Sequence, residues 1–131
     1  MLIIDANALP PTFDPKNARH KEYRPILNFI TRDRGFVAIG GSKYLAELGR
    51  LPHVLAYFME LKRNGQLRQY SSEEVDAEEL RVTDLAPLPA CDDQHLIALV
   101  SVSSARVVAT DDRRADRYLR DRGLYRRGVR R

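Results

Sequence analysis

Two short apolar runs stand near opposite ends of this chain, and each leads directly into acidic residues. Leu2-Ile3-Ile4 is followed by Asp5, and Val107-Val108-Ala109 is followed by Thr110-Asp111-Asp112. The run Leu2-Ile3-Ile4 is typical of a central strand that is buried on both faces of a parallel sheet, and residues 106–109 predict another apolar strand. The carboxyl ends of parallel strands meet at one edge of the sheet, which is where open α/β sheets bind ligands. The pattern therefore predicts a site at that edge.

The rest of the chain alternates strand and helix patterns. We expect strands also at residues 36–39 and 66–70, and helices at about 21–34, 42–49, 52–64, 71–80 and 113–122, with another helix that starts at Asp92 or Asp93. Pro10, Pro11 and Pro15 predict a loop, and Pro25 is expected in the first turn of its helix. Ser42 and Ser71 are expected to cap their helices. This order predicts a three-layer α/β/α sandwich with a mostly parallel central sheet.

Length and composition are those of one folded domain that spans residues 1–131. The chain has 131 residues, of which 44% are hydrophobic and 31% charged, as in ordinary globular proteins. Its single cysteine, Cys91, excludes an internal disulfide and a cysteine-rich zinc site, and we expect it to be inert in a reducing cytoplasm. The N-terminal apolar run stops at Asp5, and the longest uncharged stretch is residues 94–105. Neither a signal peptide nor a membrane helix is expected.

Positive charge is concentrated at the C-terminal end. Residues 113–131 hold nine arginines and two aspartates, whereas residues 1–112 hold 13 basic and 16 acidic side chains. Such a basic segment favours a polyanionic partner, although the excess of arginine over lysine is also explained by codon usage in a GC-rich genome. Arg113, Arg114 and Arg117 are candidate nucleic-acid contacts. The alternatives are a solvated helix with pairs such as Arg117 to Asp121, or a surface for an acidic partner protein.

Four acidic positions are expected at the same edge of the sheet. They are Asp5, Glu47, Asp93 or its neighbour Asp92, and Asp112 or its neighbour Asp111. Carboxylates gathered in one cleft repel one another, so their pKa values rise unless a cation neutralises them. Oxygen ligands suit Mg²⁺ or Mn²⁺, and the three histidines have no zinc-site spacing. A metal held in this way can polarise a phosphate oxygen and activate water.

Each of these residues also has an ordinary structural explanation. Asp5 can cap the turn after its strand, the paired aspartates can cap helices, and Glu47 can be a solvated helix residue. His95 would lie about 200° from Asp93 around a helix, on the opposite face. A structural or supporting role is therefore expected for His95 rather than catalysis.

Four segments together resemble the successive motifs of PIN-domain nucleases. They are Asp5-Ala6-Asn7, Glu47 within residues 42–48, Asp92-Asp93-Gln-His-Leu-Ile-Ala98, and Val107-Val-Ala-Thr-Asp-Asp112. The resemblance covers nearly the whole chain, but it is only moderate at residues 36–50 and almost absent at 51–88. No single motif is specific, whereas their order and spacing together are fairly specific.

The resemblance implies an endoribonuclease that uses Mg²⁺ or Mn²⁺, and at this size the VapC-like toxin of a type II toxin–antitoxin pair. It implies that Asp5, Glu47, Asp93 and Asp112 are the catalytic, metal-binding quartet. It also implies that Asn7 and Thr110 support the site by hydrogen bonding. Asp92 and Asp111 are alternative ligands, because each is adjacent to a member of the quartet. The implied partners are RNA, a cognate antitoxin protein and a second copy of the chain.

Two other functions are compatible with the same fold. One is an RNA-binding or partner-binding module without turnover, which an intact acidic cluster disfavours because unused like charges destabilise a fold. The other is a phosphorylated signalling receiver, which is disfavoured because no lysine follows Lys62.

Overall fold

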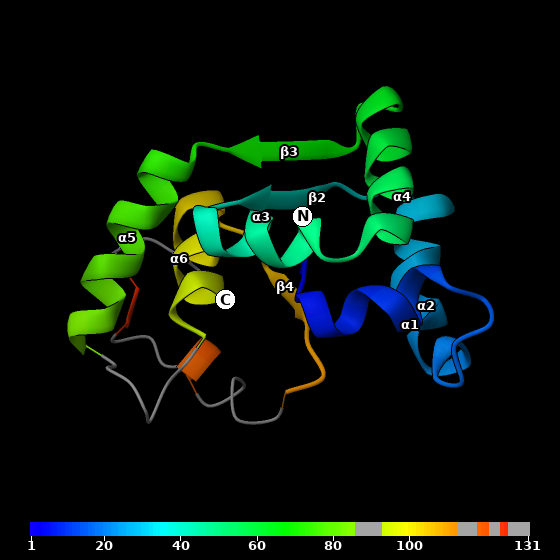
Figure 1. Cartoon of the computed structure of the whole chain (residues 1–131), viewed down its shortest axis with the longest axis horizontal. Coiled ribbons are helices and arrows are strands. Elements are labelled where there is room, and N and C mark those ends of the chain that lie inside the picture. Colours follow the sequence, from blue (N-terminus) through cyan, green and yellow to red (C-terminus); the bar gives the residue numbers. More distant parts are fainter. Residues whose placement is uncertain (86–92, 113–117, 121–123, 126–131) are drawn as a thin grey trace.

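A four-stranded parallel sheet forms the centre of the molecule (Figure 1). The computed structural model describes residues 1–85, 93–112, 118–120 and 124–125. The strand order is β3-β2-β1-β4. The strands are β1 (Leu2–Ile4), β2 (Val37–Gly40), β3 (Leu67–Tyr70) and β4 (Val107–Ala109). The expected α/β sandwich with a parallel central sheet is confirmed, and so are the four expected strands, to within one residue at their ends.

Helices pack around this sheet in three groups. In Figure 1, α5 and α6 gather at one end, α1, α2 and α4 gather at the other, and α3 crosses in front of the sheet. No helix in the described part of the chain has the length and apolar character to span a membrane. Most of the expected helix at 113–122 lies outside the described residues. The helices are η1 (Ala6–Ala8), α1 (Leu9–Phe13), α2 (His20–Thr31), α3 (Ser42–Gly49), α4 (Pro52–Arg63), α5 (Ser72–Leu85) and α6 (Gln94–Ser103).

The direction in which the chain adds strands reverses at β1. β2 and β3 are added on one side of β1, whereas β4 is added on the other. Leu2 is in register with Val37 on one side and with Val107 on the other. The carboxyl ends of β1 and β4 are joined by a hydrogen bond from the Asp5 N–H to the Ala109 carbonyl at 2.8 Å. This is the type of position at which α/β sheets bind ligands.

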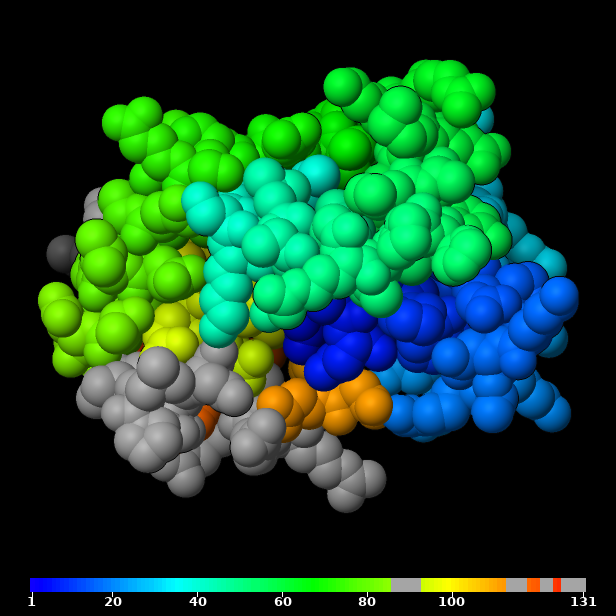
Figure 2. Space-filling model, in the orientation of Figure 1, coloured from blue at the N-terminus to red at the C-terminus, as the bar shows by residue number. Residues whose placement is uncertain are grey.

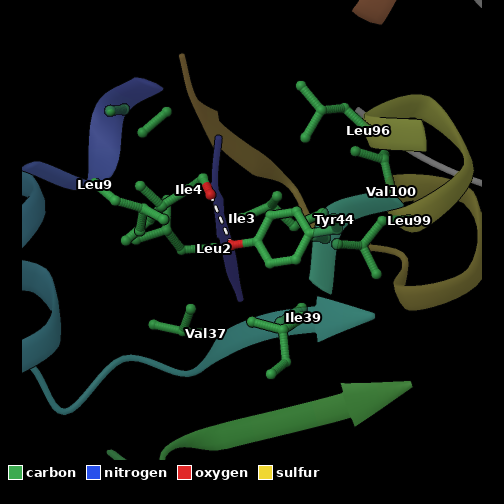
Figure 3. Close-up of a cluster of buried hydrophobic side chains, with 14 of the residues drawn as sticks. Leu2, Ile3, Ile4, Leu9, Val37, Ile39, Tyr44, Leu96, Leu99 and Val100 are labelled. Atoms are coloured by element: carbon green, nitrogen blue, oxygen red, sulfur yellow. Dashed lines mark hydrogen bonds between the residues drawn. The ribbon is translucent and has the colours of Figure 1, made fainter. Parts of the chain in front are cut away.

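The core brings together side chains from β1, β2, α3 and α6 (Figure 3). All three residues of β1 are buried, and so are residues 94–101 of α6. A helix that is buried on every side carries apolar residues all round, which explains the long uncharged stretch here. Tyr44 from α3 is fully enclosed, and its hydroxyl donates to the Ile4 carbonyl at 2.7 Å. This bond ties α3 to the last residue of β1.

The proline-rich segment after β1 differs from the expected loop. Pro10 and Pro11 lie in α1, which begins at Leu9. The first turn of a helix does not need the missing proline N–H groups, so prolines are compatible with a helix start as well as with a loop. Pro25 lies inside α2 rather than in its first turn, because the helix begins at His20.

The start of α3 also differs from the sequence expectation. Its N-cap is Gly41, with a φ of 91°, and Ser42 is the first helical residue. The Ser42 N–H and hydroxyl both donate to the carboxylate of Asp76 on α5, so a distant acid caps this helix. A Cβ on Gly41 would lie 2.7 Å from a methyl carbon of Val75. In contrast, the capping role of Ser71 is confirmed by its bond from the Glu74 N–H, although α5 continues to Leu85.

Candidate functional site

Asp5 is held in place at the point where β1 ends. It is only 5% exposed and is the N-cap of η1. One carboxylate oxygen accepts a hydrogen bond from the Ala6 N–H at 2.7 Å, and the other accepts one from the Thr110 hydroxyl at 2.8 Å. Asp5 therefore caps its turn, as the ordinary explanation required, and at the same time connects the ends of β1 and β4.

Residues that follow β4 are fixed against those that follow β1. The Thr110 hydroxyl also accepts a bond from the Asp112 N–H at 3.1 Å, and the Asn7 side-chain oxygen accepts one from the Asp111 N–H at 3.0 Å. In Figure 2, the segment after β4 lies directly beside the dark-blue segment after β1. Asn7 and Thr110 thus join the two strand ends by hydrogen bonds.

Asp5, Glu47 and His95 form a group of potential metal ligands. Each of them offers one ligand atom, and the three atoms lie within 4.8 Å of one another. Glu47 reaches the group from α3 and His95 from the first turn of α6, with 3.5 Å between His95 Nε2 and a Glu47 carboxylate oxygen. Burial raises the pKa of Glu47, and the charge of Asp5 raises it further. Burial, with smaller effects of Asp5 and Glu47, also raises the pKa of Tyr44.

Asp93 lines the same cavity as these three residues. The cavity has a volume of about 460 Å³, and Lys43 and Arg50 also line it. Asp93 is the N-cap of α6 and is 9% exposed. The expectation that His95 lies on the face opposite Asp93 is wrong. Asp93 has φ −111° and ψ 28°, outside the helix, so the angular spacing of helical residues does not apply from it.

Asp111 and Asp112 have different environments. Asp111 is exposed, and its carboxylate accepts a hydrogen bond from Arg19 at 2.5 Å. Asp112 is half-buried and is fixed through its backbone to Thr110. Among the described residues, those that line the cavity do not include Asp111 or Asp112. The structure thus brings Asp5, Glu47 and Asp93 into one cavity. Asp112 lies outside the cavity lining and is linked to Asp5 through the Thr110 hydroxyl.

Several candidates lie outside the described residues. They are the alternative ligand Asp92, the cysteine Cys91, and the candidate RNA contacts Arg113, Arg114 and Arg117. Their predicted roles remain predictions.

Two basic residues of the cavity were not singled out from the sequence. Lys43 and Arg50 stand four residues before and three residues after Glu47. Side chains at these spacings share one face of a helix, so the expected position of Glu47 already implied neighbouring positive charges. His95 was noticed, but it was assigned to the wrong side of its helix. Tyr44 was expected within the helix at residues 42–49, but its hydrogen bond to β1 was not predicted.

The donor chemistry of the cavity fits a divalent cation. Carboxylate oxygens suit Mg²⁺ and Mn²⁺, whereas imidazole nitrogen favours transition ions. A set that contains His95 together with Asp5 and Glu47 is thus better matched by Mn²⁺ than by Mg²⁺.

Comparisons of this chain with protein-family models, with curated proteins and with solved structures found no match.

Proposed function

We propose that this chain is a metal-dependent endoribonuclease that hydrolyses RNA phosphodiester bonds. The observation that carries the proposal is the meeting of Asp5, Glu47 and His95 within 4.8 Å, in a cavity that Asp93 also lines. These residues come from the position directly after β1, from α3 and from α6, which are far apart in the chain, and they meet where the strand order reverses. Acids that are close in the sequence can lie together on one hairpin or one helix without forming a site. Residues from distant segments lie together here only because the whole domain is folded.

Asp5, Glu47, Asp93 and His95 would hold Mn²⁺ or Mg²⁺, with Asp112 as the next acid along the strand edge. A bound divalent ion supplies polarisation of a phosphate oxygen and a lowered pKa of water. The bonds from Ala6 and Thr110 fix the orientation of Asp5 before any ligand arrives, which reduces the reorganisation needed during the reaction. Lys43 and Arg50 add positive charge that attracts RNA phosphates.

The biological setting that we propose follows from the PIN-domain resemblance. It is that of a cytoplasmic VapC-like toxin, with RNA as its substrate, an antitoxin protein as its inhibitor, and a homodimer as its assembled form. An adjacent reading frame for a small DNA-binding protein would support the toxin role.

A cleavage assay tests the nuclease activity directly. Purified protein is incubated with labelled single-stranded RNA in Mg²⁺, Mn²⁺ or EDTA, and the Asp5→Asn variant is compared with Asp33→Asn. Asp33 is an exposed aspartate after α2 and provides the matched control. We expect cleavage only with metal, a loss of more than about 100-fold for Asp5→Asn, and no change for Asp33→Asn.

Two results would contradict the proposal. Undiminished cleavage by Asp5→Asn would remove the role assigned to this aspartate. RNA that binds to the protein but stays intact with either metal would instead indicate a binding module without turnover.

A further inference from the structure

A second, larger cavity adjoins the acidic one. It has a volume of about 790 Å³, and it lies between the segment after β1 and the helix α4. Volumes in this range are typical of sites for small organic groups. Its apolar lining includes Pro10, Phe13, Pro52 and Tyr57. The proposed hydrolysis does not use this cavity.

An exposed aromatic ring in this cavity is held in a fixed orientation. Tyr57 is stacked on Phe13, with 5.0 Å between the ring centroids and 20° between the ring planes. Phe13 is buried and makes an edge contact with Phe58 in the core, at 5.9 Å. Tyr57 itself is 39% exposed. The exposed face of a ring that is stacked on a buried ring is a suitable surface for stacking another flat group.

Positive side chains connect the two cavities. Arg50 and Leu51 line both of them, so the two spaces share a wall at the end of α3. Lys16 also lines the apolar cavity, and Lys43 lines the acidic one. Among the described residues, Asp14 is the one acidic residue in the apolar lining. A polyanion that extends from one cavity to the other would thus pass Arg50 and end near Lys16.

We propose that the cavity between Phe13, Tyr57 and Pro52 binds one nucleobase of single-stranded RNA, with the strand passing Arg50 from the acidic cavity. The choice of RNA as the ligand rests on the proposed function. The ring of Tyr57 stacks on the base, while Arg50 and Lys16 pair with the flanking phosphates. Stacking accepts every base, so the subsite selects unpaired RNA and not a particular sequence.

The charge of the lining favours RNA over a protein segment at this position. An apolar peptide would gain from the aromatic residues but would bring no anionic group to Lys16 and Arg50. A strand of RNA uses both features at once, because it presents a flat base and a phosphate in every nucleotide.

Binding without metal tests this subsite separately from cleavage. Anisotropy of a fluorescein-labelled ten-nucleotide oligouridine is measured in EDTA, with inorganic polyphosphate as a competitor that has charge but no bases. We expect Tyr57→Ala to weaken RNA binding at least about fivefold and to leave polyphosphate binding within about twofold of the wild type. Tyr57→Phe should recover the lost affinity. Met59→Ala, on the same helix but outside the cavity lining, is the control.

A cross-linking measurement on the unchanged protein covers the case in which Tyr57→Ala folds poorly. Oligouridine that contains 5-iodouridine is irradiated with the wild-type chain, and the modified peptide is identified by mass spectrometry. A cross-link at Tyr57 supports the proposal. Cross-links confined to other segments would overturn it.

The outcomes separate this inference from the proposed function. If Mn²⁺-dependent cleavage is present but Tyr57→Ala binds RNA normally, the subsite is wrong and the nuclease assignment stands. If Tyr57→Ala loses RNA affinity and no metal supports cleavage, the subsite stands and the nuclease assignment fails. Unchanged RNA affinity, together with loss of a co-purified partner protein from Tyr57→Ala, would show a protein-docking site and overturn the proposal.

Discussion

Replacement of Tyr44 by phenylalanine isolates the bond that ties α3 to β1. The ring is fully enclosed, and its hydroxyl donates to the Ile4 carbonyl at 2.7 Å (Figure 3). Phenylalanine keeps the packing of the ring and leaves that buried carbonyl without this donor. A net cost of about 1–2 kcal/mol in the free energy of unfolding is expected for such a loss. For 131 residues, with an unfolding entropy of about 2 cal/mol/K per residue, this corresponds to a fall in Tm of about 4–7 °C.

Thermal unfolding followed by circular dichroism measures the shift, and urea titration gives the free energy independently. The control is Tyr57→Phe, which removes a hydroxyl from a ring that is 39% exposed and should change Tm by less than about 2 °C. Because the ring of the Tyr44→Phe variant would still pack, α3 should stay on the sheet, and Mn²⁺ should still raise Tm. A shift for Tyr44→Phe no larger than that of the control would refute the role of this hydrogen bond.

Three further predictions concern the site and the helix that supports it. Mn²⁺ at 100 times its Kd should raise Tm in the wild type by about 10 °C, as measured by scanning calorimetry. The same rise is expected in the control Glu79→Gln, a half-buried residue on α5, and little rise in Glu47→Gln. Thr110→Val should weaken Mn²⁺ binding about 10–100-fold in titration calorimetry, with recovery in Thr110→Ser, since it removes the donor to Asp5; equal affinity in Thr110→Val would contradict this. Gly41→Ala should cost about 1–3 kcal/mol in urea titration because its φ is 91°, and an unchanged midpoint would contradict this.

The strands were predictable because their signal is local. Residues 2–4 and 107–109 have no polar position, which is typical of strands in a parallel sheet. β1 is buried throughout, whereas the edge strand β4 leaves Val107 50% exposed. The four expected strands were found within one residue of their observed ends. Acids that directly follow these strands were then expected at one edge of the sheet, because the carboxyl ends of parallel strands share that edge.

Features that depend on contacts between distant segments were not predictable in the same way. The cap of α3 is Asp76, which is 34 residues from Ser42. The hydrogen bond of Tyr44 joins residues 40 apart. The position of Asp93 relative to His95 depends on the backbone angles of Asp93 itself, because helical periodicity does not describe a residue outside the helix. Such details are set by tertiary structure, which a pattern read along the chain does not contain.

Capping and ligand binding are not competing explanations for the acids at this edge. Asp5 caps η1 with its carboxylate, so it has a local structural reason to be acidic. Asp93 occupies the N-cap position of α6, where its side chain makes no capping bond. A carboxylate has two oxygens, each of which accepts more than one bond, so a capping bond does not prevent ligation of a cation. The capping bond instead fixes the Asp5 side chain before a metal binds, which reduces the reorganisation that binding requires. The contacts that hold Asp5 beside Glu47 and His95 thus also begin η1 directly after β1 and orient a candidate metal site.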